Sequence, residues 1–274
     1  MIVVTGATGN VGRPLVATLA AGGAKVRAVS RAVTAADVPD GVEYVRADLA
    51  RAGDLAAAFD GAEALFLLTS GEFLGTGGDL GEVMAAARAG GVRRVVLLSS
   101  QGVGTGDHPS GLEDSVKRSG VEWTMLRPGN FAANALQWAD SVRTERVIAA
   151  PFADVAFPLI DPDDIAAVAA TVLLGDGHDG KTYDLTGPVA ISPRQQAAAI
   201  GDAVGEPVRF VEETRAEATA RMTRFMPEPV VEATLNILSS PGALGQVRPD
   251  VERILGRPAR SFGDWVARNV AAFR

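Results

Sequence analysis

Cysteine is absent from this 274-residue sequence, and histidine occurs only at His108 and His178. Without cysteine the chain has no disulfide, no thiolate nucleophile and no cysteine-ligated metal site. Two histidines so far apart in the chain do not favour a histidine-based metal centre either. The residue content therefore predicts no metal site.

Long hydrophobic runs and an excess of positive charge are missing as well. The longest apolar run, residues 165–174, is far shorter than the ~18–20 residues that a membrane helix needs. A glycine-rich motif starting at Gly6 leaves no room for a signal peptide, so we expect a cytoplasmic location. The net charge of -7 gives no basic footprint, so we do not expect nucleic acid as a partner.

The first half of the chain alternates short β-branched runs with amphipathic stretches. Leu80, Val83, Met84 and Ala87, for example, follow the spacing of one helix face. Such alternation is typical of a parallel sheet with helices on both faces, so we expect a doubly wound α/β fold. The expected strands are residues 2–5, 25–30, 43–46, 64–69, 93–99 and 122–126 in the first half, and 156–160, 182–185 and 208–211 in the second.

The most informative motif is the run Gly6-Ala7-Thr8-Gly9-Asn10-Val11-Gly12, which directly follows the first expected strand and opens a helical stretch. Glycines here let the chain turn sharply, let the backbone approach a pyrophosphate, and let the helix pack closely on the strand. The pyrophosphate would then lie over free N–H groups at the helix N-terminus. We expect a Rossmann-type dinucleotide site formed by Gly6, Thr8, Gly9, Asn10, Val11 and Gly12.

The end of the second expected strand bears on the choice of dinucleotide. An NAD site usually has an acidic residue there to bind the ribose hydroxyls. This strand ends at Ser30 and Arg31, and the next carboxylate is Asp37. A guanidinium and a hydroxyl suit the 2′-phosphate of NADP(H), which we therefore expect as the cofactor. The alternative is that Arg31 is an ordinary solvated arginine.

Taken together, these motifs resemble those of the NmrA-like atypical short-chain dehydrogenase/reductases over nearly the whole chain. The glycine motif, the step 47–49, and the Arg127-Pro128 turn within residues 119–131 carry the resemblance. The resemblance implies further cofactor contacts at Asp48, Leu49, Leu68, Thr69, Ser99 and Pro128.

One feature of the wider superfamily is missing. Its Tyr-x-x-x-Lys pair, in which the tyrosine protonates the substrate, would fall at Thr105 and Pro109 when counted without gaps. Ser100 and His108 are the remaining candidates for hydrogen-bond or proton donation. Glu113 matches a glutamate common in the group, although Glu113 and Lys117 have the spacing of an exposed ion pair.

The second half of the chain is less regular and suggests a smaller lobe. We expect an NADP-binding domain at 1–153, with 154–185 partly returning to it, and a substrate lobe at 186–274 to which 128–158 contribute. In the last part, Ser261 and Asp264 form a capping-box pattern. Apolar residues that could bind substrate, or could equally be plain core, are Phe131, Trp138, Met222, Phe225 and Met226.

The predicted function is an NADPH-dependent reductase of a flat, apolar carbonyl compound such as a quinone or aromatic polyketide, working without a catalytic tyrosine. The competing hypothesis is a regulator that binds NADP(H) and a protein partner without turnover. The missing tyrosine and lysine favour the regulator, whereas the aromatic-bearing lobe favours the enzyme. The sequence gives no indication of the oligomeric state.

Overall fold

The computed structural model describes residues 1–70, 73, 75 and 78–274, and the chain divides into two compact units. Unit 1 consists of Met1–Pro128, Pro162–Leu185 and Pro249–Arg257, and unit 2 of Gly129–Asp161, Thr186–Arg248 and Pro258–Arg274. Residues 162–185 lie in unit 1, within the segment 154–185 that was expected to return there, and residues 129–161 lie in unit 2, which overlaps the expected contribution of 128–158. The expected division at 153 and 186 differs from these limits in the placement of 129–153 and 249–257. Residues 249–257 join unit 1 because they pack on it and the Asp250 carboxylate accepts the Asp184 N–H at 2.9 Å.

A seven-stranded parallel sheet forms the centre of unit 1, in the order β3-β2-β1-β4-β5-β6-β8. Its strands are β1 (Ile2–Thr5), β2 (Val26–Ser30), β3 (Glu43–Arg46), β4 (Ala64–Leu67), β5 (Arg94–Leu98), β6 (Glu122–Pro128) and β8 (Lys181–Leu185). The chain starts in the middle of the sheet and moves first to one edge and then to the other. The carboxyl ends of β1 and β4 therefore flank the point where the strand order reverses.

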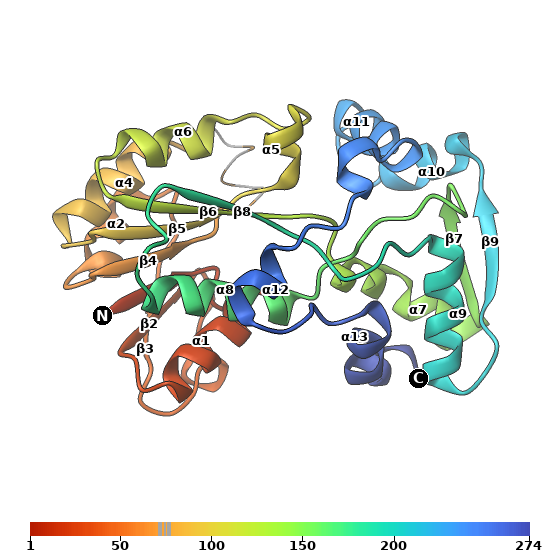
Figure 1. The fold of residues 1–274 in the computed structure, drawn as a ribbon, viewed down its shortest axis with the longest axis horizontal. Helices are drawn as coiled ribbons and strands as arrows, with labels where there is room; N and C mark the ends of the chain where they lie inside the picture. The colour runs from red at the N-terminus through yellow and green to blue at the C-terminus, as the bar shows by residue number, and fades with distance from the viewer. Residues whose placement is uncertain (71–72, 74, 76–77) are drawn as a thin grey trace. The chain divides into compact units, whose positions relative to one another are not determined.

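Helices cover both faces of this sheet (Figure 1). Among the described residues of unit 1, the helices are α1 (Gly12–Ala21), α2 (Ala52–Phe59), α4 (Leu80–Ala89), α5 (Gln101–Thr105), α6 (Gly111–Arg118), α8 (Pro162–Leu174) and α12 (Asp250–Leu255), with the 3-10 turn η1 (Ala35–Asp37). Helices α2, α4 and α6 share one buried core with the sheet, whereas α1 and α8 pack together on its other face. The doubly wound α/β fold expected from the sequence is confirmed.

The predicted strands of the first half agree with β1 to β6 to within two residues at each end. The strand predicted at 156–160 is wrong, because only isolated bridges form there, Phe157 with Ile191 and Phe131 with Ile160. Pro158 has no N–H to donate to a ladder, which explains the break. Strand β7 (Val147–Pro151) was not predicted. It pairs with β9 (Arg209–Glu213), sixty residues away in the chain.

Unit 2 packs helices and 3-10 turns around a separate core. Beside β7 and β9 it contains η2 (Ala132–Trp138), α7 (Ala139–Glu145), α9 (Pro193–Val204), α10 (Arg215–Met222), α11 (Glu228–Ser239), η3 (Gly242–Gly245), α13 (Phe262–Asn269) and η4 (Val270–Phe273). The predicted capping box is present, since Ser261 and Asp264 bond reciprocally at the start of α13. The Phe262 and Trp265 rings of this helix stack 5.7 Å apart within the core.

Within the part of the chain that the structure describes, no helix has the length and apolar character needed to cross a membrane.

Candidate functional site

The glycine motif forms a tight turn between β1 and α1. Gly6 has a φ of +63°, a conformation that favours glycine, and the Gly9 N–H donates to the Gly6 carbonyl at 3.0 Å. A Cβ on Gly12 would lie 2.2 Å from the same carbonyl oxygen, well inside van der Waals contact. Gly12 is therefore required for the turn itself to form.

Gly9 differs from Gly12 in what surrounds it. Gly9 is exposed, and the nearest described atom to an added Cβ is the Gly6 carbonyl oxygen at 3.3 Å. The outer side of the turn is thus open at Gly9, where the backbone leads into α1. A helix N-terminus presents N–H groups without intrahelical partners, so this opening suits a pyrophosphate.

A cavity of about 210 Å³ opens beside this turn in unit 1. It brings together eight of the residues predicted for the cofactor: Gly6, Thr8, Gly9, Ser30, Arg31, Asp48, Leu49 and Leu68. The Thr8 and Ser30 hydroxyls are 3.0 Å apart, which links the turn to the end of β2. The cavity thus combines a glycine turn with hydroxyl groups and a guanidinium, a donor set that fits a dinucleotide phosphate.

Asp37, the first carboxylate after β2, is occupied within its own loop. Its carboxylate accepts the Thr34 hydroxyl at 2.7 Å and the Thr34 N–H at 3.0 Å, and Arg13 lies 3.4 Å away. The hydrogen bonds from Thr34, aided by Arg13, lower the pKa of this half-buried carboxyl. Asp37 is not among the residues that line the cavity, which leaves Arg31 and Ser30 at the end of β2.

Six of the predicted cofactor residues do not line this cavity: Asn10, Val11, Gly12, Thr69, Ser99 and Pro128. Five lining residues were not predicted: Thr5, Val29, Ala47, Ser70 and Phe73. Thr5 had a sequence signal, because it is the last residue of β1 and a polar residue after an apolar run. Its hydroxyl bonds the β4 end, accepting the Leu68 N–H at 2.8 Å and donating to the Leu68 carbonyl at 3.0 Å.

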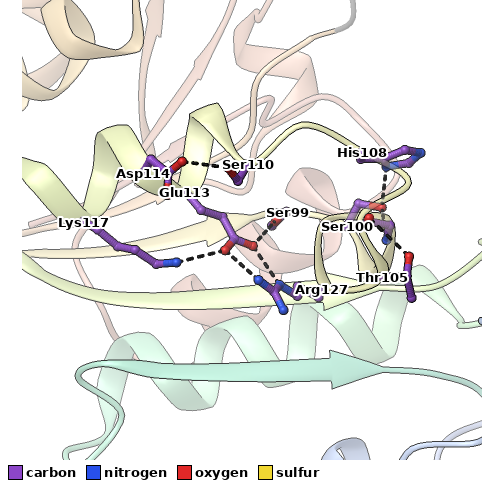
Figure 2. Close-up of polar contacts among 10 residues, drawn as sticks. Ser99, Ser100, Thr105, His108, Ser110, Glu113, Asp114, Lys117 and Arg127 are labelled. Atoms are coloured by element: carbon purple, nitrogen blue, oxygen red, sulfur yellow. Dashed lines mark hydrogen bonds and ion pairs between the residues drawn. The ribbon is translucent and has the colours of Figure 1, made fainter. Parts of the chain in front are cut away.

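Ser99 instead belongs to a buried ionic network at the ends of β5 and β6 (Figure 2). The Glu113 carboxylate, 1% exposed, accepts Arg127 Nε and Nη2, each at 2.8 Å, Ser99 Oγ at 2.7 Å and Lys117 Nζ at 3.2 Å. Burial opposes its ionisation, but the hydrogen bonds from Arg127 and Ser99 outweigh burial and hold the pKa of Glu113 at about 2. Glu113 and Lys117 are therefore not the exposed pair that their spacing alone indicates.

Ser100 and His108 meet at the start of α5, as Figure 2 shows. His108 Nδ1 is 3.0 Å from Ser100 Oγ, which also accepts the Gly102 N–H at 3.1 Å. A Cβ on Gly102 would lie 2.6 Å from the imidazole, so glycine is what lets the ring come this close. When Nδ1 carries the hydrogen, Ser100 Oγ accepts two hydrogen bonds and its own hydrogen is available for a third partner.

A second cavity, of about 450 Å³, lies within unit 2. All five residues predicted to bind substrate line it: Phe131, Trp138, Met222, Phe225 and Met226. Trp138 is buried and also belongs to the unit 2 core, whereas Phe225 is 84% exposed. Phe152, Val155 and Phe157 add further apolar surface that was not predicted from the sequence. Phe152 follows β7, which was not predicted, and Phe157 lies in a segment that was predicted as a strand.

Comparison with known proteins places the chain in a family. Residues 6–175 match a family model described as NAD(P)H-binding. A reductase of (4-alkanoyl-5-oxo-2,5-dihydrofuran-3-yl)methyl phosphate from Streptomyces griseus is 40% identical, over 100% of this chain and 99% of the relative. An NAD(P)H azoreductase from Xenophilus azovorans is 33% identical, over 100% and 99%.

Solved structures agree in fold over almost the whole length. An NADPH-dependent quinone oxidoreductase from Escherichia coli, complexed with NADPH, has a TM-score of 0.80 and 27% identity over 99% of both chains. The negative transcriptional regulator NmrA, in complex with NAD, has a TM-score of 0.73 and covers 98% of this chain and 95% of its own. Because NmrA and this chain are only 18% identical, the likeness shows a shared fold and nothing more.

The glycine turn, the cavity beside it and these relatives agree with one another, and the predicted nicotinamide cofactor and NmrA-like resemblance are confirmed. The chain belongs to the NAD(P)H-binding family and is an oxidoreductase.

Proposed function

We propose that this protein is an NADPH-dependent reductase of a flat, apolar carbonyl compound, with a quinone or an aromatic polyketide-type ketone as the substrate class. The observation that carries the proposal is the unit 2 cavity, around which five apolar residues predicted from the sequence gather. Its volume of about 450 Å³ falls within the range of small-molecule sites. Aromatic and thioether side chains suit a planar apolar ring.

Preference for NADPH over NADH rests on the cavity of unit 1. Arg31 and Ser30 line it at the end of β2, while Asp37 is engaged by Thr34 and Arg13. A guanidinium binds the 2′-phosphate of NADPH with charge-assisted hydrogen bonds that NADH lacks.

The tyrosines of this chain do not resemble a catalytic acid. Tyr44 is exposed on β3, and the Tyr183 hydroxyl lies 2.8 Å from His178 Nδ1. Burial and the Asp250 charge raise the pKa of Tyr183, which makes it a weaker acid. The chemistry that we propose therefore depends on a substrate that needs little acid assistance.

A quinone meets that requirement. The reduced nicotinamide supplies a hydride when bound, and one further proton completes the two-electron reduction to a hydroquinone. Negative charge on a quinone-derived oxygen is delocalised over the ring, so that proton can come from solvent or from a neighbouring substrate hydroxyl. Ser100 can stabilise the developing charge through its hydroxyl hydrogen, which is available when His108 Nδ1 carries its own hydrogen.

The test is NADPH consumption by the purified protein with a panel of benzoquinones, naphthoquinones and polycyclic ketones. Phe131→Ala should raise KM for the best substrate roughly tenfold, about the cost of losing one ring contact. Leu136→Ala is the matched control, because Leu136 is an exposed residue of η2, the turn that follows Phe131, and does not line the cavity. Equal effects of the two substitutions would count against substrate binding in this cavity.

A second candidate substrate is a phosphate ester of a conjugated lactone, the class that the Streptomyces griseus relative reduces. One observation favours it. Arg221 is the single charged side chain among the described residues lining the unit 2 cavity. Glu213 accepts its Nε at 2.9 Å and its Nη2 at 2.8 Å. A guanidinium carries five N–H groups, so Arg221 held in this way can also donate to a phosphate oxygen.

The two candidates respond differently to loss of Arg221. For a phosphate ester, Arg221→Met should lower kcat/KM by roughly 10- to 100-fold, the worth of charge-assisted hydrogen bonds. For a neutral quinone it should change little. Arg224→Met is the control, since Arg224 is exposed and does not line the cavity. A phosphate ester reduced equally well by both variants would eliminate this second candidate.

A further inference from the structure

Two residues other than glycine have a positive φ among the described residues, Arg146 at +53° and Phe152 at +56°. Arg146 has an ordinary explanation. It follows the last residue of α7, and its N–H caps the carbonyls of that helix, a position where left-handed residues are common. Phe152 follows the last residue of β7 and caps no helix. For a bulky residue this conformation is a true outlier and costs free energy.

The backbone around Phe152 is held by interactions on three sides. The Phe152 carbonyl accepts the Val155 N–H at 3.0 Å, which closes a turn. The next residue, Ala153, donates its N–H to Glu212 at 3.1 Å and accepts the Arg194 N–H at 3.1 Å.

An ion pair reinforces the same turn from outside. Arg194 binds Asp154 through Nε at 2.9 Å and Nη2 at 3.2 Å. The surroundings of Phe152 thus impose its backbone conformation, and the strain is maintained rather than relaxed.

The strained conformation places the Phe152 side chain at the unit 2 cavity. Phe152 lines the cavity and is half-buried. It packs with Met222 and Met226 against the small buried cluster of Ala218, Val231 and Leu235. An aromatic ring that lines an open cavity together with two flexible thioethers can cover one face of a planar ligand.

We propose that Phe152 determines substrate specificity by holding a flat aromatic ring of the substrate, and that the left-handed turn is retained for this purpose at a cost to stability. The inference rests on the proposed substrate class and adds a residue to it. It requires two properties of Phe152, a strained backbone and a ring contact with the substrate. Replacement by glycine removes both, whereas replacement by alanine removes only the ring contact.

The experiment compares Phe152→Gly with Phe152→Ala, two variants that both lose the ring and differ by one Cβ in the left-handed backbone. Phe152→Gly should melt about 2–4 °C above Phe152→Ala. Alanine keeps the Cβ that is strained in the left-handed conformation and glycine lacks it, and relief of such strain raises the melting temperature by about this amount in a protein of this length. Both variants should bind menadione roughly tenfold more weakly than the starting protein. NADPH affinity should stay the same in all three.

Binding is measured with menadione and NADP⁺, a mixture without a hydride source, by quenching of tryptophan fluorescence. Trp138 lines the cavity and serves as the reporter. Arg146→Gly and Arg146→Ala are the matched pair, because Arg146 shares the positive φ but not the cavity. Those variants should repeat the difference in melting temperature and leave menadione binding unchanged.

Failure of this inference can be told apart from failure of the proposed function. Equal melting of Phe152→Gly and Phe152→Ala, or menadione affinity unchanged by loss of the ring, would overturn the role of Phe152. Binding that depends on Phe152 without any NADPH consumption would instead support that role and reject the proposed reduction of quinones.

Discussion

The hydroxyl groups of Thr8 and Ser30 lie 3.0 Å apart, so the glycine turn after β1 is joined to the end of β2. These two segments flank the cavity lined by Gly6, Thr8 and Gly9 on one side and Ser30 and Arg31 on the other, residues predicted from the sequence to bind the cofactor phosphates. Thr8 belongs to the glycine turn that would bind the pyrophosphate. Ser30 stands beside Arg31 at the site that would distinguish NADPH from NADH, so the contact joins the two sites. The first two predictions test these parts separately.

Arg31→Ala should weaken NADPH binding about 10- to 150-fold and leave NADH binding unchanged. The expected loss is that of charge-assisted hydrogen bonds to the 2′-phosphate, roughly 1.5–3 kcal/mol. Titration of both cofactors by calorimetry measures it. Arg51→Ala is the control, since Arg51 is exposed and outside the cavity. Equal affinity of the starting protein for NADPH and NADH would remove the basis of this prediction.

Gly9 and Gly12 should fail in different ways when replaced. Gly9→Val should fold, because its Cβ meets only the Gly6 carbonyl at 3.3 Å, and should lose NADPH binding because the side chain enters the pyrophosphate space. Gly12→Val should lose the fold itself, because its Cβ would lie 2.2 Å from that carbonyl. Circular dichroism and cofactor titration separate the two. A folded Gly9→Val that binds NADPH normally would overturn the interpretation of the motif.

The sequence predicted the features that leave a local pattern and missed those that depend on residues far apart in the chain. The β1–β6 strands of unit 1 could be predicted because most of them are short apolar runs separated by helical or turn segments, which is a local pattern. Strand β7 was not visible, since its partner β9 is sixty residues away and the pairing leaves no local periodicity. The burial of Glu113 was hidden for a similar reason. Its partner Arg127 lies on β6, so spacing revealed only Lys117.

Glu113 should make stability depend on pH. Its pKa is held at about 2, below the ordinary 4.5, so the ionised form stabilises the folded state. The contribution, roughly 3 kcal/mol, is fully present above pH 4.5 and is lost as pH falls toward 2. Glu113→Gln should therefore be less stable than the starting protein at pH 7, with a difference that shrinks between pH 4.5 and 2. Urea unfolding at several pH values measures this difference; a constant gap across the range would contradict the role of the carboxylate.

Ser100 and His108 should contribute unequally to the reduction of quinones. Ser100→Ala should lower kcat roughly 10²-fold if its hydroxyl stabilises the developing oxyanion. His108→Ala should cost well under the ~10²–10⁴-fold of a general acid, because the proton comes from solvent or from a substrate hydroxyl beside the carbonyl. Substrates with and without that hydroxyl, compared in steady-state assays, test the point. Loss of activity in His108→Ala alone, or in Tyr183→Phe, would show that a protein acid does act.

We propose that this protein transfers a hydride from NADPH to an apolar carbonyl compound. The most direct test follows the nicotinamide absorbance when purified protein, NADPH and a quinone panel are mixed. We expect NADPH consumption in proportion to enzyme for at least one naphthoquinone, slower with NADH, and reduced by Phe131→Ala but not by Leu136→Ala. Tight NADPH binding with no consumption on any quinone or polycyclic ketone would contradict it and support a sensor that binds the cofactor without turnover.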